Sequence, residues 1–215
     1  MVYNLVVVGA SGFGRETLDV IEAVEKNDGS VQVQGVVDDA PSKINLERLR
    51  DRSIPFLGNV DEWSKNSDKE TRFVIGIGSS KIRKSISEKL EALGFQTLSL
   101  VHPRAEVGSN VEISDGVVVC AGAVISTNVV LSRYSHVNPN ATIGHDTKIN
   151  EFVSLNPGSI VSGEVEIKSG VLVGAGALIL QQLTIGSNST VGAGAVVTKD
   201  VPPDVVVKGV PGRWT

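Results

Sequence analysis

The residues best suited to chemistry in this 215-residue chain are a histidine and an aspartate side by side, His145 and Asp146, in the segment NATIGHDTKINEF. An imidazole titrates near neutral pH, so it is the usual proton acceptor when a hydroxyl or an amine attacks a thioester. A neighbouring carboxylate could fix the imidazole tautomer and raise its basicity. Adjacent residues of a straight strand face opposite ways, so the pair requires a bend in the chain. We therefore expect His145 to be a general base, assisted by Asp146, at a corner.

A repeat of six residues fills the second half of the chain and supplies such corners. From Val101 to Val197 every sixth residue is aliphatic, and a small or apolar residue stands four positions later, as at Ala123 and Ala141. Neither the helical nor the strand period gives this spacing, whereas a parallel β-helix does, with three short strands and three corners in each coil. Seventeen hexads predict between five and six coils. Tight corners need positive φ or close backbone approach, which explains the intervening glycines Gly108, Gly144, Gly174, Gly176, Gly186, Gly192 and Gly194.

The first half alternates predicted strands and helices. A strand from Leu5 to Val8 runs into the glycine-rich turn Gly9 to Gly14, and a helix is expected to begin near Arg15. Further strands are predicted at residues 31–37 and 73–77, then a helix with Ile82, Ile86 and Leu90 on one face, and a last strand in QTLSL. This order predicts a small parallel α/β domain over residues 1–98, followed by the β-helix domain over residues 99–215.

The glycine-rich turn is a candidate phosphate-binding site. Its spacing, G-x-x-G-x-G, differs from the dinucleotide fingerprint G-x-G-x-x-G, but it lies between a strand and a helix, and Asp38 and Asp39 end the next strand, as ribose recognition requires. Backbone N–H groups at the helix start could hold a phosphate. The alternative is that the glycines only pack helix against strand. Because the second half of a dinucleotide fold is missing, a nucleotide joined to something small, such as a sugar nucleotide, is favoured.

Composition limits the partners and the compartment. The net charge of −4, the pI near 5.4 and the lack of a Lys/Arg run argue against a nucleic acid or an anionic membrane as partner. The apolar stretch Leu5 to Ala10 is too short for a signal peptide or a membrane span. The single cysteine, Cys120, cannot form an intramolecular disulfide and is expected to be a small structural filler. A cytoplasmic protein is predicted.

The repeats VGAGAL, IGSNST and VGAGAV and the closing GVP resemble the hexapeptide-repeat acyltransferases. Over residues 3–213 the chain is similar to bacterial sugar acetyltransferases of the sialic-acid O-acetyltransferase type, and in layout to the nucleotide-4-amino-sugar N-acetyltransferases. The motifs that carry this resemblance are GASGFG, the Asp pair, IGIGSSKIRKSI, IGHD and EFVSLNPGSIVSGEVEI. It implies a Rossmann-like half domain, a left-handed β-helix, acetyl-CoA as cosubstrate, no metal, and a role in glycan biosynthesis. It also implies a homotrimer with CoA between neighbouring coils and His145 at the subunit boundary.

The resemblance also assigns roles to residues of this chain. It implies His145 as general base with Asp146 assisting, and backbone groups of Ala175 and Ala193 against acetyl-CoA. The residues implied for sugar-nucleotide binding are Ser11, Gly12, Phe13, Asp38, Asp39 and Gly78. Two positions depart from the family: Phe13 replaces a frequent histidine, and Ser154 replaces a histidine that some members place near acetyl-CoA. Asn138, in the hexad before the base, is a further candidate for holding the acceptor, with a purely structural corner asparagine as the alternative.

The resulting expectation is direct transfer of an acetyl group to a nucleotide-linked 4-amino sugar. O-acetylation of sialic acid or another sugar hydroxyl is the main alternative, because the same base serves an alcohol. A non-catalytic nucleotide-binding or scaffolding module is a second alternative. A zinc enzyme of the γ-carbonic-anhydrase kind is disfavoured, since His102, His136 and His145 fall at different positions of the coil. The unbroken hexad register leaves no inserted loop for the acceptor, so residues 1–98 are expected to recognise it.

Overall fold

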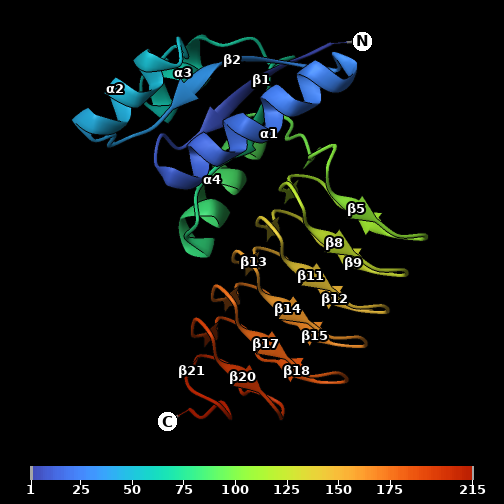
Figure 1. Ribbon diagram of the computed structural model, residues 1–215. Coiled ribbons are helices and arrows are strands. Elements are labelled where there is room, and N and C mark those ends of the chain that lie inside the picture. Colours follow the sequence, from blue (N-terminus) through green and yellow to red (C-terminus); the bar gives the residue numbers. More distant parts are fainter. Residues whose placement is uncertain (1, 215) are drawn as a thin grey trace. The chain divides into compact units, whose positions relative to one another are not determined.

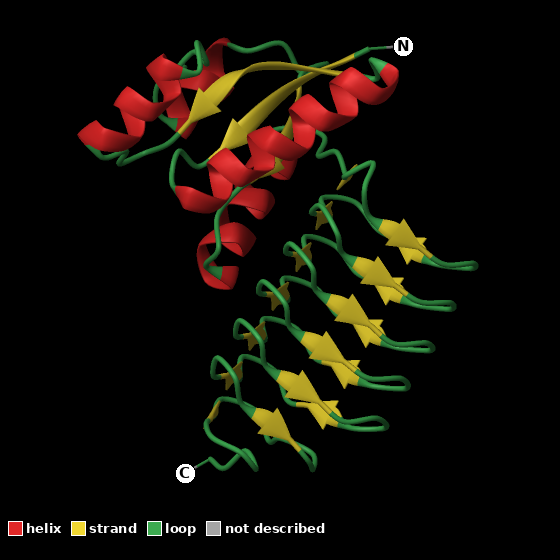
Figure 2. Cartoon of the chain, in the orientation of Figure 1, coloured by secondary structure: helices red, strands yellow, loops and turns green. Residues whose placement is uncertain are grey.

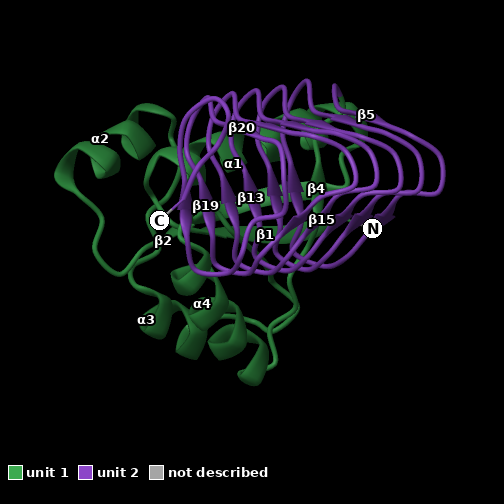
Figure 3. Ribbon diagram, turned by 90° about the horizontal axis from the view of Figure 1, so that it is seen from below, with its two compact units in different colours: residues 1–103 green, residues 104–215 purple. Residues whose placement is uncertain are grey.

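The structure is a computed structural model that describes residues 2–214. The chain divides into two compact units, residues 1–103 and 104–215, which Figure 3 distinguishes by colour. The first unit is α/β and the second is a parallel β-helix, and each is described by itself. Among the described residues, no helix is long and apolar enough to cross a membrane.

The first unit is a three-stranded parallel sheet with helices. Its elements are β1 (Tyr3–Val8), α1 (Gly12–Asp28), β2 (Val31–Val37), α2 (Lys43–Asp51), α3 (Val60–Asn66), β3 (Arg72–Ile75), α4 (Ser80–Ala92) and β4 (Leu100–Val101), as labelled in Figure 1. The strand order β2-β1-β3 places β1 in the centre, where Leu5 to Val8 are at most 1% exposed. The chain leaves β1 on one side toward β2 and returns on the other as β3. This sheet therefore has a topological switch point between β1 and β3, where ligands of such folds bind.

Local chemistry explains where the predicted elements of this unit were displaced. Helix α1 begins at Gly12, three residues before the predicted start, because Ser11 is extended and forms the N-cap. Helices α2 and α3 were not predicted; they are short, and side-chain caps from Ser42 and Asn59 start them. Segment QTLSL contributes an isolated bridge between Thr97 and Phe73, and its last residue, Leu100, begins the strand β4.

The predicted apolar face of α4 is only partly its buried face, because Leu90 is buried and Ile82 is not. Ile82 is 52% exposed, whereas Arg83, Ser87 and Leu90 are buried. Arg83 Nη1 donates to the carbonyl oxygens of Ile77 at 2.7 Å and Gly78 at 3.1 Å. Burial lowers the pKa of Arg83 to about 10. A polar contact with a loop therefore takes the place that periodicity assigned to an aliphatic residue.

The second unit is a left-handed parallel β-helix of about six coils, as predicted (Figure 2). Its strands are two residues long and stack on three faces. Face 1 holds β7 (Val118–Val119), β10 (His136–Val137), β13 (Ser154–Leu155), β16 (Leu172–Val173), β19 (Thr190–Val191) and β21 (Val206–Val207). Face 2 holds β5 (Glu106–Val107), β8 (Val124–Ile125), β11 (Thr142–Ile143), β14 (Ile160–Val161), β17 (Leu178–Ile179) and β20 (Val196–Val197). Face 3 holds β6 (Glu112–Ile113), β9 (Val130–Leu131), β12 (Lys148–Ile149), β15 (Glu166–Ile167) and β18 (Thr184–Ile185).

The hexad sets both the core and the corners of the β-helix. Aliphatic residues such as Ile143 and Leu155 are 0% exposed, and so is Ala123 at the small position. The third residue after the aliphatic one adopts the left-handed conformation, including Gly176 and Gly194 among the predicted glycines. Gly144 and Gly174 serve the other purpose, because a Cβ there would lie 2.5 Å from a backbone nitrogen of the next coil. Each class of corner glycine therefore has a distinct steric reason.

Leu155 and Leu180 offer a test of this core, since the first is 0% and the second 37% exposed. Leu155→Ala should lower the free energy of unfolding by about 2–5 kcal/mol, because it leaves a cavity between coils. Leu180→Ala should change it by no more than about 0.5 kcal/mol. Urea denaturation followed by circular dichroism measures both. Equal destabilisation by the two variants would contradict the assignment of inside and outside.

Candidate active site

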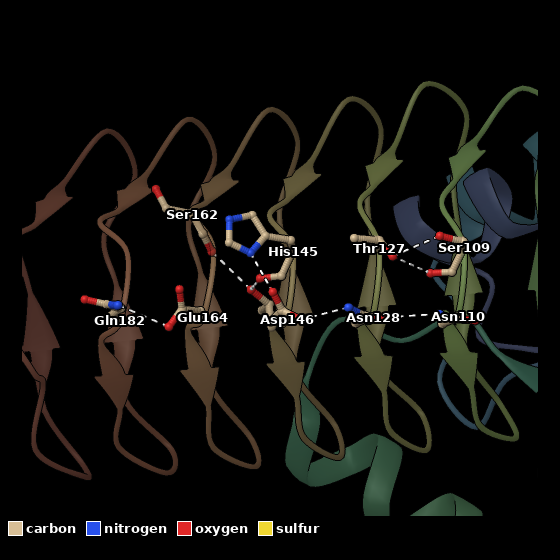
Figure 4. A network of polar contacts seen from close by, with 10 residues as sticks. Ser109, Asn110, Thr127, Asn128, His145, Asp146, Ser162, Glu164 and Gln182 are labelled. Atoms are coloured by element: carbon tan, nitrogen blue, oxygen red, sulfur yellow. Dashed lines mark hydrogen bonds and ion pairs between the residues drawn. The ribbon is translucent and has the colours of Figure 1, made fainter.

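The corner between β11 and β12 brings His145 and Asp146 together. Asp146 has φ of 59°, which turns its side chain back toward the preceding residue. His145 Nδ1 lies 2.7 Å from Asp146 Oδ2, and the two side chains are 55% and 48% exposed (Figure 4). The bend that the pair requires is thus supplied by the left-handed corner residue of the hexad itself.

The carboxylate determines which imidazole nitrogen carries the proton. An ionised carboxylate only accepts hydrogen bonds, so Nδ1 is the donor and Nε2 of the neutral ring keeps its lone pair. Hydrogen bonds from Asn128 and then from His145 hold the pKa of Asp146 below its usual value. The ionised form of Asp146 is therefore favoured, and the exposed ring presents a proton acceptor at Nε2.

Residues of the neighbouring coils complete this site, and they were not predicted. Asn128 Nδ2, one coil before, donates to Asp146 Oδ1 at 2.9 Å. Gly163, one coil after, lies under the ring: a Cβ at this position would be 2.6 Å from His145 Nε2. Neither residue stands near His145 in the sequence. The signal that could have found them is the coil length, since both lie 18 residues from a member of the pair.

The other predicted residues of the β-helix lie elsewhere on the coil. Asn138, Ala175 and Ala193 occupy the corner between faces 1 and 2, and Ser154 belongs to face 1, whereas His145 occupies the corner between faces 2 and 3. Asn138 Nδ2 donates to Asn156 Oδ1 at 3.1 Å, so the amide takes part in a ladder between coils. Ala175 and Ala193 are exposed at equivalent positions of successive coils. A single chain thus separates the expected base from these candidates by one face.

In the first unit, Ser11, Gly12 and Gly78 lie just beyond the carboxyl ends of β1 and β3, at the switch point. Gly9 and Gly14 have packing reasons: Gly9 has φ of 112°, and a Cβ on Gly14 would lie 1.8 Å from the Gly9 oxygen. Gly12 and Gly78 have none, because a Cβ at either would meet no atom within 4 Å. The hydroxyl of Ser11 makes no cap hydrogen bond with α1. This edge therefore combines open space with the N-terminus of α1, as an anion site requires.

The acidic pair and Phe13 have structural contacts that the sequence did not reveal. Asp38 Oδ2 accepts from the Ala10 N–H at 2.7 Å and so holds the glycine-rich turn. Asp39 Oδ1 accepts from the Val60 N–H at 2.9 Å at the start of α3. The Phe13 carbonyl accepts from the Thr17 hydroxyl at 2.8 Å. Asp38 and Asp39 therefore shape the edge of the sheet, whatever else they contact.

Open hollows also lie outside these positions, including the following two. One of about 720 Å³ in the first unit is lined by Gln34, Glu62, Trp63, Asn66 and Asp68 among others. The other, about 590 Å³, lies at the last coil and includes Lys208, Arg213 and Trp214. The second hollow offers two cations and an aromatic ring, a set suited to a phosphate-bearing nucleotide.

Among the described residues, His102, His136 and Cys120 belong to no metal-binding cluster. Within residues 2–214, no group of three or more His, Cys, Asp or Glu side chains is arranged to hold a metal ion. His102 belongs to the first unit and His136 to β10, apart from His145 in the corner after β11. Cys120 is buried, 2% exposed.

Comparisons with known proteins match both units. The family model for the PglD N-terminal domain matches residues 4–90. GDP-perosamine N-acetyltransferase of Escherichia coli O157:H7 is 31% identical over 139 residues, which span 61% of this chain and only 58% of that relative. The structure of PerB from Caulobacter crescentus, in complex with CoA and GDP-perosamine, has 26% identity and a TM-score of 0.88, with 99% of this chain and 97% of that one covered. The acetyltransferase domain of PglB from Neisseria gonorrhoeae FA1090, in complex with acetyl coenzyme A, has 30% identity, a TM-score of 0.86 and both chains covered at 100%. Matched over its whole length in this way, the chain belongs to the hexapeptide-repeat sugar acetyltransferases.

Proposed function

We propose that this protein is an acetyl-CoA-dependent N-acetyltransferase that acts on a nucleotide-linked 4-amino sugar. The observation that carries the proposal is the 2.7 Å contact between His145 Nδ1 and Asp146 Oδ2, which leaves Nε2 as an exposed proton acceptor. The relatives support the substrate class, since PerB was solved with CoA and GDP-perosamine and the PglB domain with acetyl coenzyme A.

The proposed reaction is a direct acyl transfer. The amine nitrogen of the sugar attacks the thioester carbonyl carbon, a C–N bond forms, and His145 Nε2 takes one proton from the amine. Collapse of the tetrahedral intermediate breaks the C–S bond, and the CoA sulfur leaves and is protonated to the thiol. Asp146 stabilises the imidazolium that forms, and backbone N–H groups of the coil stabilise the oxyanion. No side chain is acylated, so both substrates must be bound together.

Acetyl-CoA is expected along the β-helix, against Ala175 and Ala193. Lys208 and Arg213 at the last coil would meet its phosphates. These residues lie at another corner of the coil than His145, and Ser154 lies on face 1. A homotrimer would bring His145 close to the acetyl-CoA residues, because a threefold ring can place the corner of one protomer against a different face of its neighbour. Trimer formation in the cytoplasm and a place in glycan biosynthesis are parts of this proposal.

The acceptor is expected at the switch point of the first unit. Ser11, Gly12 and Gly78 supply open backbone for the phosphates, while Asp38 and Asp39 keep remaining lone pairs for ribose hydroxyls. Phe13 would then offer a ring face at the position where the family resemblance implies a frequent histidine. Asn138 Oδ1 is buried and accepts no hydrogen bond from the described residues, and Asn138 remains a further candidate for holding the acceptor.

O-acetylation of a sugar hydroxyl is the alternative reaction, since the same imidazole would serve as base. None of the contacts described for the site favours the other alternative, a non-catalytic nucleotide-binding module.

The role of His145 as general base is tested by thiol release. With acetyl-CoA and a panel of UDP-, dTDP- and GDP-linked 4-amino sugars, one acceptor should trigger rapid thiol release, and His145→Asn should lower kcat about 100- to 10,000-fold. Sialic acid serves as the hydroxyl control in the same assay. Full activity of His145→Asn would refute the assigned base, and release with sialic acid alone would establish the O-acetyl alternative.

The acceptor site at the switch point is tested at Gly78. Gly78→Val should raise the KM for the sugar nucleotide about tenfold or more, because the new side chain fills space that the fold itself leaves open. The thermal midpoint and the KM for acetyl-CoA should stay unchanged, which excludes general damage. An unaltered acceptor KM would place the nucleotide away from the switch point.

A further inference from the structure

We propose that Asn128 and Gly163 are positioning residues for the base: Asn128 orients the Asp146 carboxylate from the preceding coil, and Gly163 provides the floor for the His145 ring from the following coil. This inference rests on the proposed function of His145. It assigns roles to two residues outside the pair of His145 and Asp146.

The first observation is a chain of amide hydrogen bonds that ends on the carboxylate. Asn110 Nδ2 donates to Asn128 Oδ1 at 3.3 Å, and Asn128 Nδ2 donates to Asp146 Oδ1 at 2.9 Å (Figure 4). Because Asn128 Oδ1 is occupied by Asn110, the amide must direct its nitrogen toward Asp146. Asp146 then has one oxygen for Asn128 and the other for His145 Nδ1.

The second observation is that this chain of amides stops at Asp146. Glu164 occupies the same corner one coil later, and it accepts from Gln182 Nε2 at 3.1 Å. Among the described residues no hydrogen bond joins Glu164 to Asp146, as expected for two carboxylates. The titratable groups described at this corner are thus His145, Asp146 and Glu164. The Asn128 amide donates to Asp146 Oδ1, while His145 Nδ1 contacts Oδ2. A backbone hydrogen bond, from the Asp146 N–H to the Thr127 oxygen at 3.1 Å, fixes the corner itself.

The third observation is the contact of the ring with Gly163. A Cβ at this glycine would lie 2.6 Å from Nε2, 2.7 Å from Cε1 and 3.0 Å from Cδ2 of His145. Its φ is outside the left-handed region, so alanine suits the backbone. The three atoms nearest to the added Cβ all belong to the exposed imidazole, so alanine would displace this ring first. Other residues at this corner position, such as Thr127 and Gln181, carry side chains.

Asn128 is tested with variants that keep its left-handed backbone, φ 57°. Asn128→Gly removes the amide, and Asn128→Asp replaces it with a carboxylate. Gln182→Gly is the matched control, because it has the same corner, φ 62°, and breaks an equivalent bond to Glu164. Carboxyl carbon NMR of Asp146, without substrates, should show its pKa rise in both Asn128 variants, more in Asn128→Asp, and stay unchanged in Gln182→Gly. An Asp146 pKa equal in wild type and Asn128→Gly would overturn the role of Asn128, independently of any activity.

Kinetics then connect this contact to the reaction. Asn128→Gly should lower kcat about three- to tenfold with both KM values unchanged, since a partly exposed charge-assisted hydrogen bond is lost. Gln182→Gly should leave kcat at the wild-type value. A normal kcat in Asn128→Gly, or an equal loss in both variants, would contradict a positioning role. Failure of the proposed function would look different, because His145→Asn would then remain active.

Gly163→Ala tests the floor. We expect kcat to fall about 10- to 100-fold, because a displaced base misses the geometry of transfer. The thermal midpoint and both KM values should match those of wild type. Gln181→Ala, at the same corner one coil later, is the control and should retain activity. Wild-type kcat in Gly163→Ala, or a loss explained by unfolding, would overturn the role of Gly163.

Discussion

The site depends on one left-handed residue. Asp146 has φ of 59°. This left-handed conformation is unfavourable for residues that have a Cβ, and aspartate and asparagine tolerate it better than most. With ordinary strand geometry, His145 and Asp146 would face opposite ways. The hexad forces the bend at this position in every coil from Asn110 to Gly194, so the fold itself bears the strain. The 2.7 Å hydrogen bond between the two side chains is a direct consequence.

The stacking of coils gives this exposed pair the support that a buried site draws from its surroundings. Exposed ionic contacts are weak and screened by water, so the 2.7 Å contact alone would not define one ring orientation. Neighbouring coils add fixed partners at a spacing of 18 residues: an amide on one side and a bare glycine on the other. The motions that remain to the His145 ring are those that a bound substrate would restrict. A β-helix can thus carry a candidate catalytic pair at one corner without a change in the register of its hexads.

The sequence predicts the architecture well because the hexad is a strong steric signal. The aliphatic positions such as Ile143 and Leu155 are buried, and the left-handed β-helix is confirmed. Predictions were poorer where short-range polar contacts decide: capped helices α2 and α3 were missed, and Arg83 rather than Ile82 is buried in α4. The adjacent pair His145 and Asp146 could be found by inspection. Asn128 and Gly163 could not, since only the three-dimensional coil brings them beside the pair. The role of Asn138, Ser154, Ala175 and Ala193 stays a prediction, because one chain sets them at a different part of the coil.

The most direct test of this account is the protonation pattern of the His145 ring. Nitrogen NMR of labelled protein, at a pH where the ring is neutral, distinguishes a proton on Nδ1 from one on Nε2. The account predicts the Nδ1–H tautomer in the wild type, held by Asp146, and its loss in Asp146→Asn, which keeps a side chain suited to the left-handed corner. A wild-type ring protonated on Nε2 would have no lone pair at Nε2, the nitrogen that is proposed to accept the proton of the amine. That result would contradict His145 as the base.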